Sequence, residues 1–171
     1  MVEIVDRYVD TAFGGGTLRA AGLRARLRVS ADGVVLAVKG RATVTGDGVT
    51  TRMELEAPAT ADLDPARWPA SPAQQLAMDT AAGAPLVEIA AVRQRREVRN
   101  VRRGDAVVEL SLDELTALDA NGLGAATRME LEAELKAGPA SALADLAQAL
   151  AAIEGLGPPL GSKLEFALSA R

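Results

Sequence analysis

The stretch that decides the fold is MELEAELKAG, residues 129–138, in which charged and apolar residues alternate. Glu130, Glu132 and Glu134 occupy every second position, and Lys136 continues their row. The positions between them are Leu or Ala. Because successive side chains of a β-strand point to opposite faces, this period of two predicts a strand with one charged face and one apolar face.

Other parts of the chain repeat this alternation. Arg alternates with Leu, Ala and Val in residues 23–29, and the Asp32-Gly33 pair after them predicts a hairpin with the β-prone run 34–39. The remaining alternating segments are 52–57, 93–99, 108–113 and a last short strand at 163–166. Strand after strand therefore carries charge on one face.

Helical spacing is confined to three segments. Residues 72–82 follow a Ser71 that fits a helix cap, residues 140–153 place Leu at helical intervals before Gly155, and a short helical turn is predicted at 17–21. Many antiparallel strands with few helices predict an α+β fold. We expect the strands to form an antiparallel β-barrel or strongly curved sheet, with the helices packed outside.

Composition excludes several kinds of site and partner. With neither Cys nor His among the 171 residues, thiolate nucleophiles, a His base and Cys-ligated metals are excluded. The balance of 19 basic against 23 acidic residues, with only 2% aromatics, argues against nucleic acid as a partner. The sequence also contains no apolar run of bilayer length and no secretory signal, so we expect no membrane contact and a cytoplasmic location.

The charged faces predict phosphate chemistry if they turn inward and line a tunnel. Arg and Lys side chains bind triphosphates and polyphosphates well. Glu130, Glu132 and Glu134 would hold a hard ion such as Mg²⁺ or Mn²⁺, which delivers water to a terminal phosphate. The alternative is a solvated face with cross-strand ion pairs, each worth about 0.2–1 kcal/mol.

Seven stretches, in order along the chain, resemble the CYTH domain, the triphosphate tunnel metalloenzyme family of inorganic triphosphatases, thiamine triphosphatases and class IV adenylate cyclases. They are YVDT (8–11), AAGLRARLRV (20–29), LAVKG (36–40), RMELEAP (52–58), VVELSLDE (107–114), MELEAELKAG (129–138) and SKLEFAL (162–168). The resemblance implies an eight-stranded antiparallel tunnel that binds a triphosphate and two divalent metal ions.

The resemblance also implies roles for individual residues. The implied phosphate-binding residues are Arg26, Arg28, Lys39, Arg95, Lys136 and Lys163. The implied metal ligands are Glu130, Glu132 and Glu134, with Mg²⁺ or Mn²⁺ as the cofactor. Further acids of the tunnel are Glu54, Glu56, Glu109 and Asp113.

One family motif has no counterpart in the sequence. The family opens with an ExExK strand, whereas Glu3, Asp6 and Arg7 have a different spacing. Residues 1–171 are therefore expected to form a single CYTH-like domain without its first strand. In many relatives a helical CHAD-type domain follows the CYTH domain, and a homodimer remains an open alternative.

The resemblance and the charged faces predict metal-dependent hydrolysis of a small triphosphate, such as inorganic tripolyphosphate. Two alternatives stay open. One is a catalytically inactive module that binds phosphate or polyphosphate. The other is an adenylate cyclase.

Overall fold

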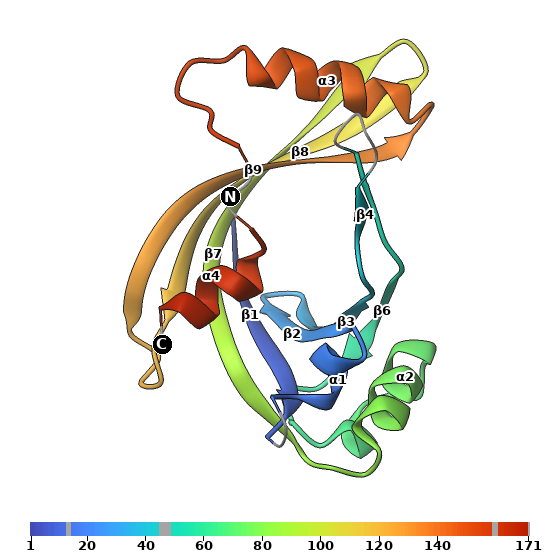
Figure 1. Ribbon diagram of the computed structural model, residues 1–171, viewed down its shortest axis with the longest axis vertical. Helices are drawn as coiled ribbons and strands as arrows, with labels where there is room; N and C mark the ends of the chain where they lie inside the picture. Colours follow the sequence, from blue (N-terminus) through green and yellow to red (C-terminus); the bar gives the residue numbers. More distant parts are fainter. Residues whose placement is uncertain (13–14, 45–48, 159–160, 171) are drawn as a thin grey trace.

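Seven antiparallel strands form one large sheet in this computed structural model, which describes residues 1–12, 15–44, 49–158 and 161–170 (Figure 1). Their order is β6-β3-β2-β1-β7-β8-β9, and β4 and β5 form a separate ribbon. The large-sheet strands are β1 (Val2–Thr11), β2 (Arg24–Ser30), β3 (Gly33–Lys39), β6 (Glu54–Ala59), β7 (Leu86–Arg103), β8 (Ala106–Leu118) and β9 (Gly124–Ala137). The ribbon strands are β4 (Thr43–Val44) and β5 (Thr50–Thr51).

Four α-helices accompany the strands in the described residues. They are α1 (Thr17–Ala20), α2 (Pro72–Ala81), α3 (Ser141–Ala151) and α4 (Lys163–Ser169), with a short 3₁₀ helix, η1 (Pro65–Arg67). The predicted helices at 17–21, 72–82 and 140–153 are thus confirmed. Within the part of the chain described, no helix is long and apolar enough to cross a bilayer.

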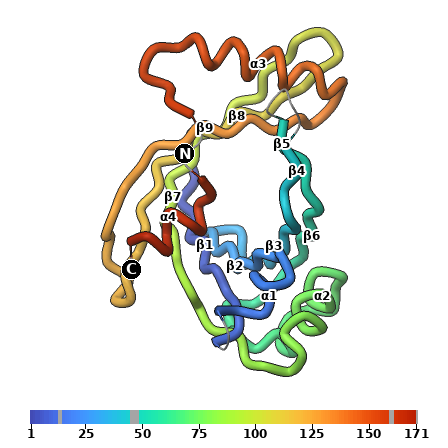
Figure 2. Tube along the Cα trace, viewed as in Figure 1, coloured from blue at the N-terminus to red at the C-terminus, as the bar shows by residue number. Residues whose placement is uncertain are grey.

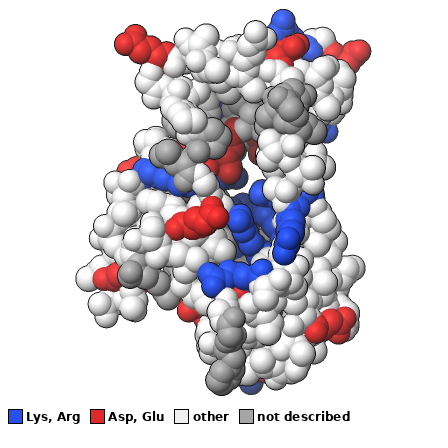
Figure 3. Space-filling view, in the orientation of Figure 1, with Lys and Arg blue, Asp and Glu red and all other residues white. Residues whose placement is uncertain are grey.

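The large sheet bends around a central space. Figures 1 and 2 show β7, β8 and β9 curving over one side of it, with β2, β3 and β6 on the other. Figure 3 shows the space as an opening in the molecular surface. The edge strands β6 and β9 do not pair with each other in the described residues. The predicted α+β fold with a tunnel-like antiparallel sheet is confirmed, although the described strands do not close into a continuous ladder.

The convex face of the sheet carries the main hydrophobic core. Leu27 of β2 and Leu36 and Val38 of β3 are almost fully buried beneath α2, which contributes Ala73 and Ala77. A buried Leu or Val side chain contributes roughly 1.5–3 kcal/mol to folding. Because this face is apolar and covered, the alternating charged residues of the same strands must face the concave side.

The last helix, α4, corrects the sequence prediction of a strand at 163–166. Ser162 accepts a hydrogen bond from the backbone N–H of Glu165 (3.2 Å), and the Glu165 side chain accepts one from the N–H of Ser162 (2.7 Å). This reciprocal capping satisfies the free donors of a helix start. The four residues Lys163 to Phe166 alternate in a way that fits a strand or a short helix. The hydrogen bonds of the cap stabilise the helix.

Helix α4 also lies on the concave side of the sheet, so the expectation that all helices pack outside is wrong for this one. Its Leu164 and Ala167 pack against Tyr8, Ala90 and Leu115 of the sheet. Its first residue, Lys163, donates a hydrogen bond to Asp113 of β8 (2.6 Å), so this side chain reaches the tunnel from a helix rather than from a strand.

Candidate functional site

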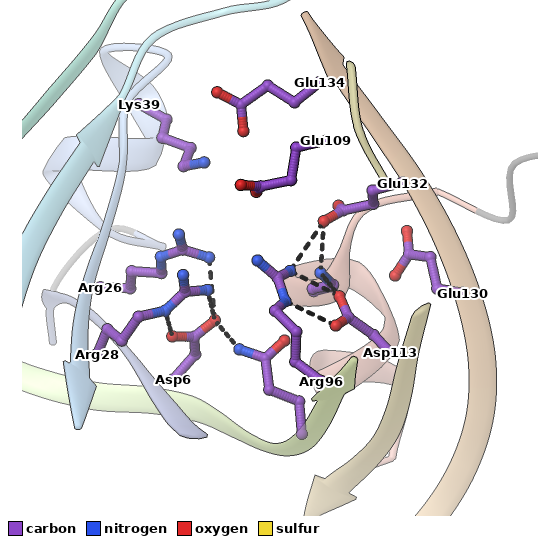
Figure 4. A network of polar contacts seen from close by, with 12 residues as sticks. Asp6, Arg26, Arg28, Lys39, Arg96, Glu109, Asp113, Glu130, Glu132 and Glu134 are labelled. Atoms are coloured by element: carbon purple, nitrogen blue, oxygen red, sulfur yellow. Dashed lines mark hydrogen bonds and ion pairs between the residues drawn. The ribbon is translucent and has the colours of Figure 1, made fainter. Parts of the chain in front are cut away.

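Cross-strand register places the basic residues of β2 and β3 on the concave face. Arg28 lies opposite Asp6 of β1, and Arg24 lies opposite Lys39 of β3. Because directly opposed residues share a face, these side chains, together with Arg26, all lie on the concave side of the sheet. Figure 4 shows Arg26, Arg28 and Lys39 projecting toward the same space.

Asp6 is the centre of this basic group. Its carboxylate is fully buried and accepts hydrogen bonds from Arg26 Nη1 (2.9 Å), Arg28 Nε and Nη2 (2.8 and 2.9 Å) and Gln94 Nε2 (2.9 Å). Burial raises the pKa of Asp6, but its bonds with Arg28 and the charge of Arg26 outweigh burial and hold the pKa below its usual value. Asp6 therefore stays ionised and fixes both guanidinium groups.

A second buried acid, Asp113 of β8, organises the neighbouring part of the tunnel. It accepts two hydrogen bonds from Arg96 (2.7 Å each) and one from Lys163 Nζ of α4 (2.6 Å). Burial raises the pKa of Asp113, yet Arg96 and Lys163 lower it overall. Both cations also contact Glu132 of β9 at 3.0 Å. Asp113 thus joins three elements at one point.

Strands β8 and β9 supply an acidic wall. Glu109 of β8 lies directly opposite Glu134 of β9, and Lys136 Nζ approaches both carboxylates (3.6 and 2.9 Å). Figure 4 shows Glu109 and Glu134 pointing into the tunnel across from Lys39. Two opposed carboxylates repel each other unless a cation lies nearby. The tunnel therefore has a basic wall on β2 and β3 and an acidic wall on β8 and β9.

The remaining predicted acids lie on β6, beside the basic wall. Glu54 pairs with Lys39 Nζ at 2.6 Å, and Glu56 occupies the next position on the same face. Burial and the charge of Arg26 lower the pKa of Lys39 below its usual value, although Glu54 opposes the shift. Lys39 thus lies in a basic environment that favours an additional anion.

The acidic wall suits a divalent ion that needs only one or two carboxylates from the protein. In the described part of the chain, no three acidic side chains group closely enough to hold a metal by themselves. Mg²⁺, however, is usually bound by one or two carboxylates together with substrate phosphates and water. The opposed Glu109 and Glu134 fit that requirement. Glu130 is paired with Arg128 (3.2 Å), Glu132 with Lys163 (3.0 Å) and Glu134 with Lys136 (2.9 Å), so the predicted roles of all three as metal ligands stay predictions.

Arg95 does not face the tunnel as the sequence analysis expected. It lies opposite Glu114 on the convex face, half-exposed, and pairs with it at 3.4 Å. Its neighbour Arg96 occupies the tunnel position instead, opposite Asp113. The register of the β7–β8 hairpin, fixed by its turn at Gly104, determines this placement.

Three residues of the site were missed by sequence reasoning: Asp6, Gln94 and Arg96. Counting back from the hairpin turn at Arg103-Gly104-Asp105 would have paired Arg96 with Asp113. No comparable local signal exists for Asp6 and Gln94, because they meet across β1 and β7, which are separated by more than 70 residues of chain.

The solved structures that share this fold include the following three. A Hippeastrum protein, provisionally assigned as an adenylyl cyclase and described as having a dominant triphosphatase activity, matches with a TM-score of 0.74 and 20% identity over 98% of this chain and 82% of that one. A provisionally assigned adenylate cyclase from Bacillus halodurans matches with a TM-score of 0.59 and 15% identity, over 96% and 81%. A Pyrococcus horikoshii OT3 protein matches with a TM-score of 0.58 and 20% identity, over 100% of this chain and 87% of that one.

These likenesses establish the fold, which is the tunnel fold of the CYTH domain that the sequence motifs resemble. No family model and no curated protein matches the sequence.

Proposed function

We propose that this chain binds a small triphosphate, inorganic tripolyphosphate foremost, in its tunnel and hydrolyses the terminal phosphoanhydride bond with Mg²⁺ or Mn²⁺. The observation that supports the proposal is the division of charge between the two walls. A triphosphate needs cations along one side, and a carboxylate wall on the other side suits a divalent ion that accompanies the phosphates.

The residues of the basic wall would bind and orient the anion. Arg26, Arg28 and Lys39 offer guanidinium and ammonium donors that form charge-assisted hydrogen bonds with phosphate oxygens. Asp6 holds the first two in place before the anion arrives, so little side-chain entropy is lost on binding. The reaction breaks the terminal P–O–P bond with water as the nucleophile, releasing orthophosphate and a diphosphate.

The acidic wall would hold the divalent ion through Glu109 and Glu134, with Glu132 beside them. Such an ion, when bound, neutralises phosphate charge and lowers the pKa of a coordinated water. The two carboxylates would hold the ion beside the phosphates, and Lys136, which contacts both of them, would balance part of their charge.

A second candidate function is binding without catalysis. It is favoured by the ion pairs of the tunnel acids, since Asp113, Glu132 and Glu134 each already contact a Lys or Arg within 3.0 Å. A site whose acids are neutralised by the protein itself suits an anion-binding module that needs no metal.

The experiment that separates these functions measures orthophosphate release from tripolyphosphate, with Mg²⁺, with Mn²⁺ and with neither. Release that requires a metal supports the triphosphatase. Binding of tripolyphosphate without release under all conditions selects the binding module. Conversion of ATP to cyclic AMP in a parallel assay would select the adenylate cyclase. Two of the structural neighbours are provisionally assigned that activity.

Replacing Asp6 tests how the basic wall is held. Asp6→Asn cannot accept all four hydrogen bonds, and its amide presents a donor to two guanidinium groups. We expect the dissociation constant for tripolyphosphate, measured by calorimetry, to rise about tenfold, the equivalent of one net hydrogen bond.

Asp10→Asn is the matched control for Asp6. Asp10 lies on the same strand and is equally buried. It accepts hydrogen bonds from the backbone N–H groups of its neighbour Thr11 and of Leu18 and Arg19 at the start of α1. This variant should lose stability while keeping its affinity for tripolyphosphate. A similar loss of affinity in both variants would show that Asp6 acts only through general stability.

Replacing Glu134 tests the acidic wall. Glu134→Gln should weaken Mn²⁺ binding in the presence of tripolyphosphate about tenfold or more, measured by the electron paramagnetic resonance of free Mn²⁺. Glu130→Gln should have a smaller effect, because Glu130 lies opposite Asp113, which is already bonded to Arg96 and Lys163, whereas Glu134 lies opposite Glu109. If Glu130→Gln weakened Mn²⁺ binding more than Glu134→Gln, the ion would belong near Glu130 and Asp113, farther along the two strands.

A further inference from the structure

A basic groove adjoins the tunnel at Lys39. The groove has a volume of about 520 Å³ and lies between α1, β2, the end of β3 and α4. Its charged lining residues are Arg19, Arg24, Lys39, Arg41, Arg52 and Glu165. Five of these six are cations. Figure 3 shows Lys and Arg side chains gathered along one rim of the opening, in agreement with this lining.

The cations of the groove continue the row that lines the tunnel. Arg24, Arg26 and Arg28 share one face of β2, so their backbones follow one another at intervals of about 7 Å. Arg26 and Arg28 belong to the proposed triphosphate site, whereas Arg24 opens into the groove beside Lys39. A chain of phosphates along this row would pass from the tunnel into the groove.

The positive charge of the groove is only partly neutralised. Arg19 lies 3.7 Å from Asp10 and Arg24 lies 3.6 Å from Glu165. Arg52 lies 4.0 Å from Glu54, which is itself bonded to Lys39, so three carboxylates face five cations. In the described part of the chain no carboxylate pairs with Arg41, which is exposed. An exposed cation in a groove with surplus positive charge favours an anionic ligand.

The lining disfavours a base or another aromatic group. None of the described residues that line the groove is aromatic, and its apolar side chains are Leu23, Leu164, Leu168 and Ala42. Nucleobases are commonly held by stacking on aromatic rings. The chemistry of the groove therefore matches further phosphates better than it matches a nucleoside.

We infer that the groove is an extension subsite for the fourth and later phosphates of a linear polyphosphate, whose first three phosphates occupy the tunnel. The inference rests on the proposed triphosphate site and assigns Arg24 and Arg41 to recognition of chain length. It makes unbranched inorganic phosphate chains longer than three the preferred ligands over organic triphosphates.

The test compares the dissociation constants of tripolyphosphate, tetrapolyphosphate and ATP by calorimetry in one low-salt buffer without metal. The wild-type chain should bind tetrapolyphosphate about tenfold more tightly than tripolyphosphate, and ATP no more tightly than tripolyphosphate. In Arg41→Ala the advantage of the longer chain should fall below about threefold. Arg103→Ala, which removes an exposed Arg far along β7, should keep it.

Equal affinity for the two polyphosphates in the wild-type chain would overturn the inference, as would an advantage that survives Arg41→Ala. Tighter binding of ATP that is lost in Arg41→Ala would overturn it in favour of a nucleoside subsite. These outcomes differ from failure of the proposed triphosphate site, which would appear as no binding of tripolyphosphate at all.

Discussion

Replacing both Arg26 and Arg28 with glutamine should lower the affinity for tripolyphosphate by at least about 100-fold. The two guanidinium groups are held together by Asp6 and face the tunnel from neighbouring inward positions of β2. Hydrogen bonds to charged groups contribute roughly 1.5–3 kcal/mol each, and about 1.4 kcal/mol corresponds to a tenfold change in affinity. Calorimetric titration at low salt measures the change.

Arg95→Gln is the matched control for the double variant. It removes a guanidinium from the same sheet, but on the convex face, where Arg95 pairs with Glu114. Its affinity for tripolyphosphate should match that of the wild-type chain. The single variant Arg26→Lys, which keeps the charge near Asp6, separates loss of the anion contact from misfolding. Unchanged affinity in the double variant would remove β2 from the site.

Removing the Asp113 side chain should lower the free energy of unfolding by about 3–5 kcal/mol, the usual result of leaving buried charges without their partner. Asp113 is fully buried, and Asp113→Ala would leave Arg96 and Lys163 facing each other beside Glu132 alone. Lys163 attaches the first turn of α4 to Asp113, so the helix should loosen when that bond is lost. Denaturant unfolding at neutral pH measures the loss.

Glu114→Ala, one position away on the exposed convex face, should change the unfolding free energy by no more than about 0.5 kcal/mol. Acid provides a second check. The pKa of Asp113 is lower when folded than when unfolded, so its stabilisation is present above the unfolded pKa and is lost as the pH falls through the folded value. Asp113→Ala should therefore lose less stability in acid than the wild-type chain. A similar loss of stability in Asp113→Ala and Glu114→Ala would contradict the described network.

Much of the fold followed from the alternation of charged and apolar residues. In MELEAELKAG the pattern alone placed Glu132 and Glu134 on one face, and in β2 it separated Arg26 and Arg28 from Leu27. The apolar face is buried under α2 on the convex side, so the charged face lies on the concave side. The sequence pattern shows which residues share a face because side chains alternate along every strand. The free-energy cost of burying a charge then keeps the charged residues off the face that forms the core.

The errors arose where local patterns are ambiguous. The segment around Lys163 alternates like a strand, but the Ser162–Glu165 cap and the burial of Leu164 and Ala167 make it a helix. The Arg-rich run of β7 carries charges on both faces, so alternation could not select Arg96 over Arg95. Only pairing with Asp113 does so.

The position of Asp6 shows what the sequence could not provide. An acid near the N-terminus, with spacing unlike the family motif, gave no reason to expect a central role. Its partners Arg26, Arg28 and Gln94 come from two other strands, and only the strand order β2-β1-β7 brings them together. A cluster of this kind depends on topology rather than on spacing.

The central claim is that the two walls of the tunnel form a site for a triphosphate anion. Calorimetric titration of the wild-type chain with tripolyphosphate, repeated at low and at high salt, tests it most directly. We expect one binding site whose affinity for tripolyphosphate falls steeply as the salt concentration rises, because attraction between charges dominates. An absence of binding at low salt, or an affinity that does not change with salt, would contradict it.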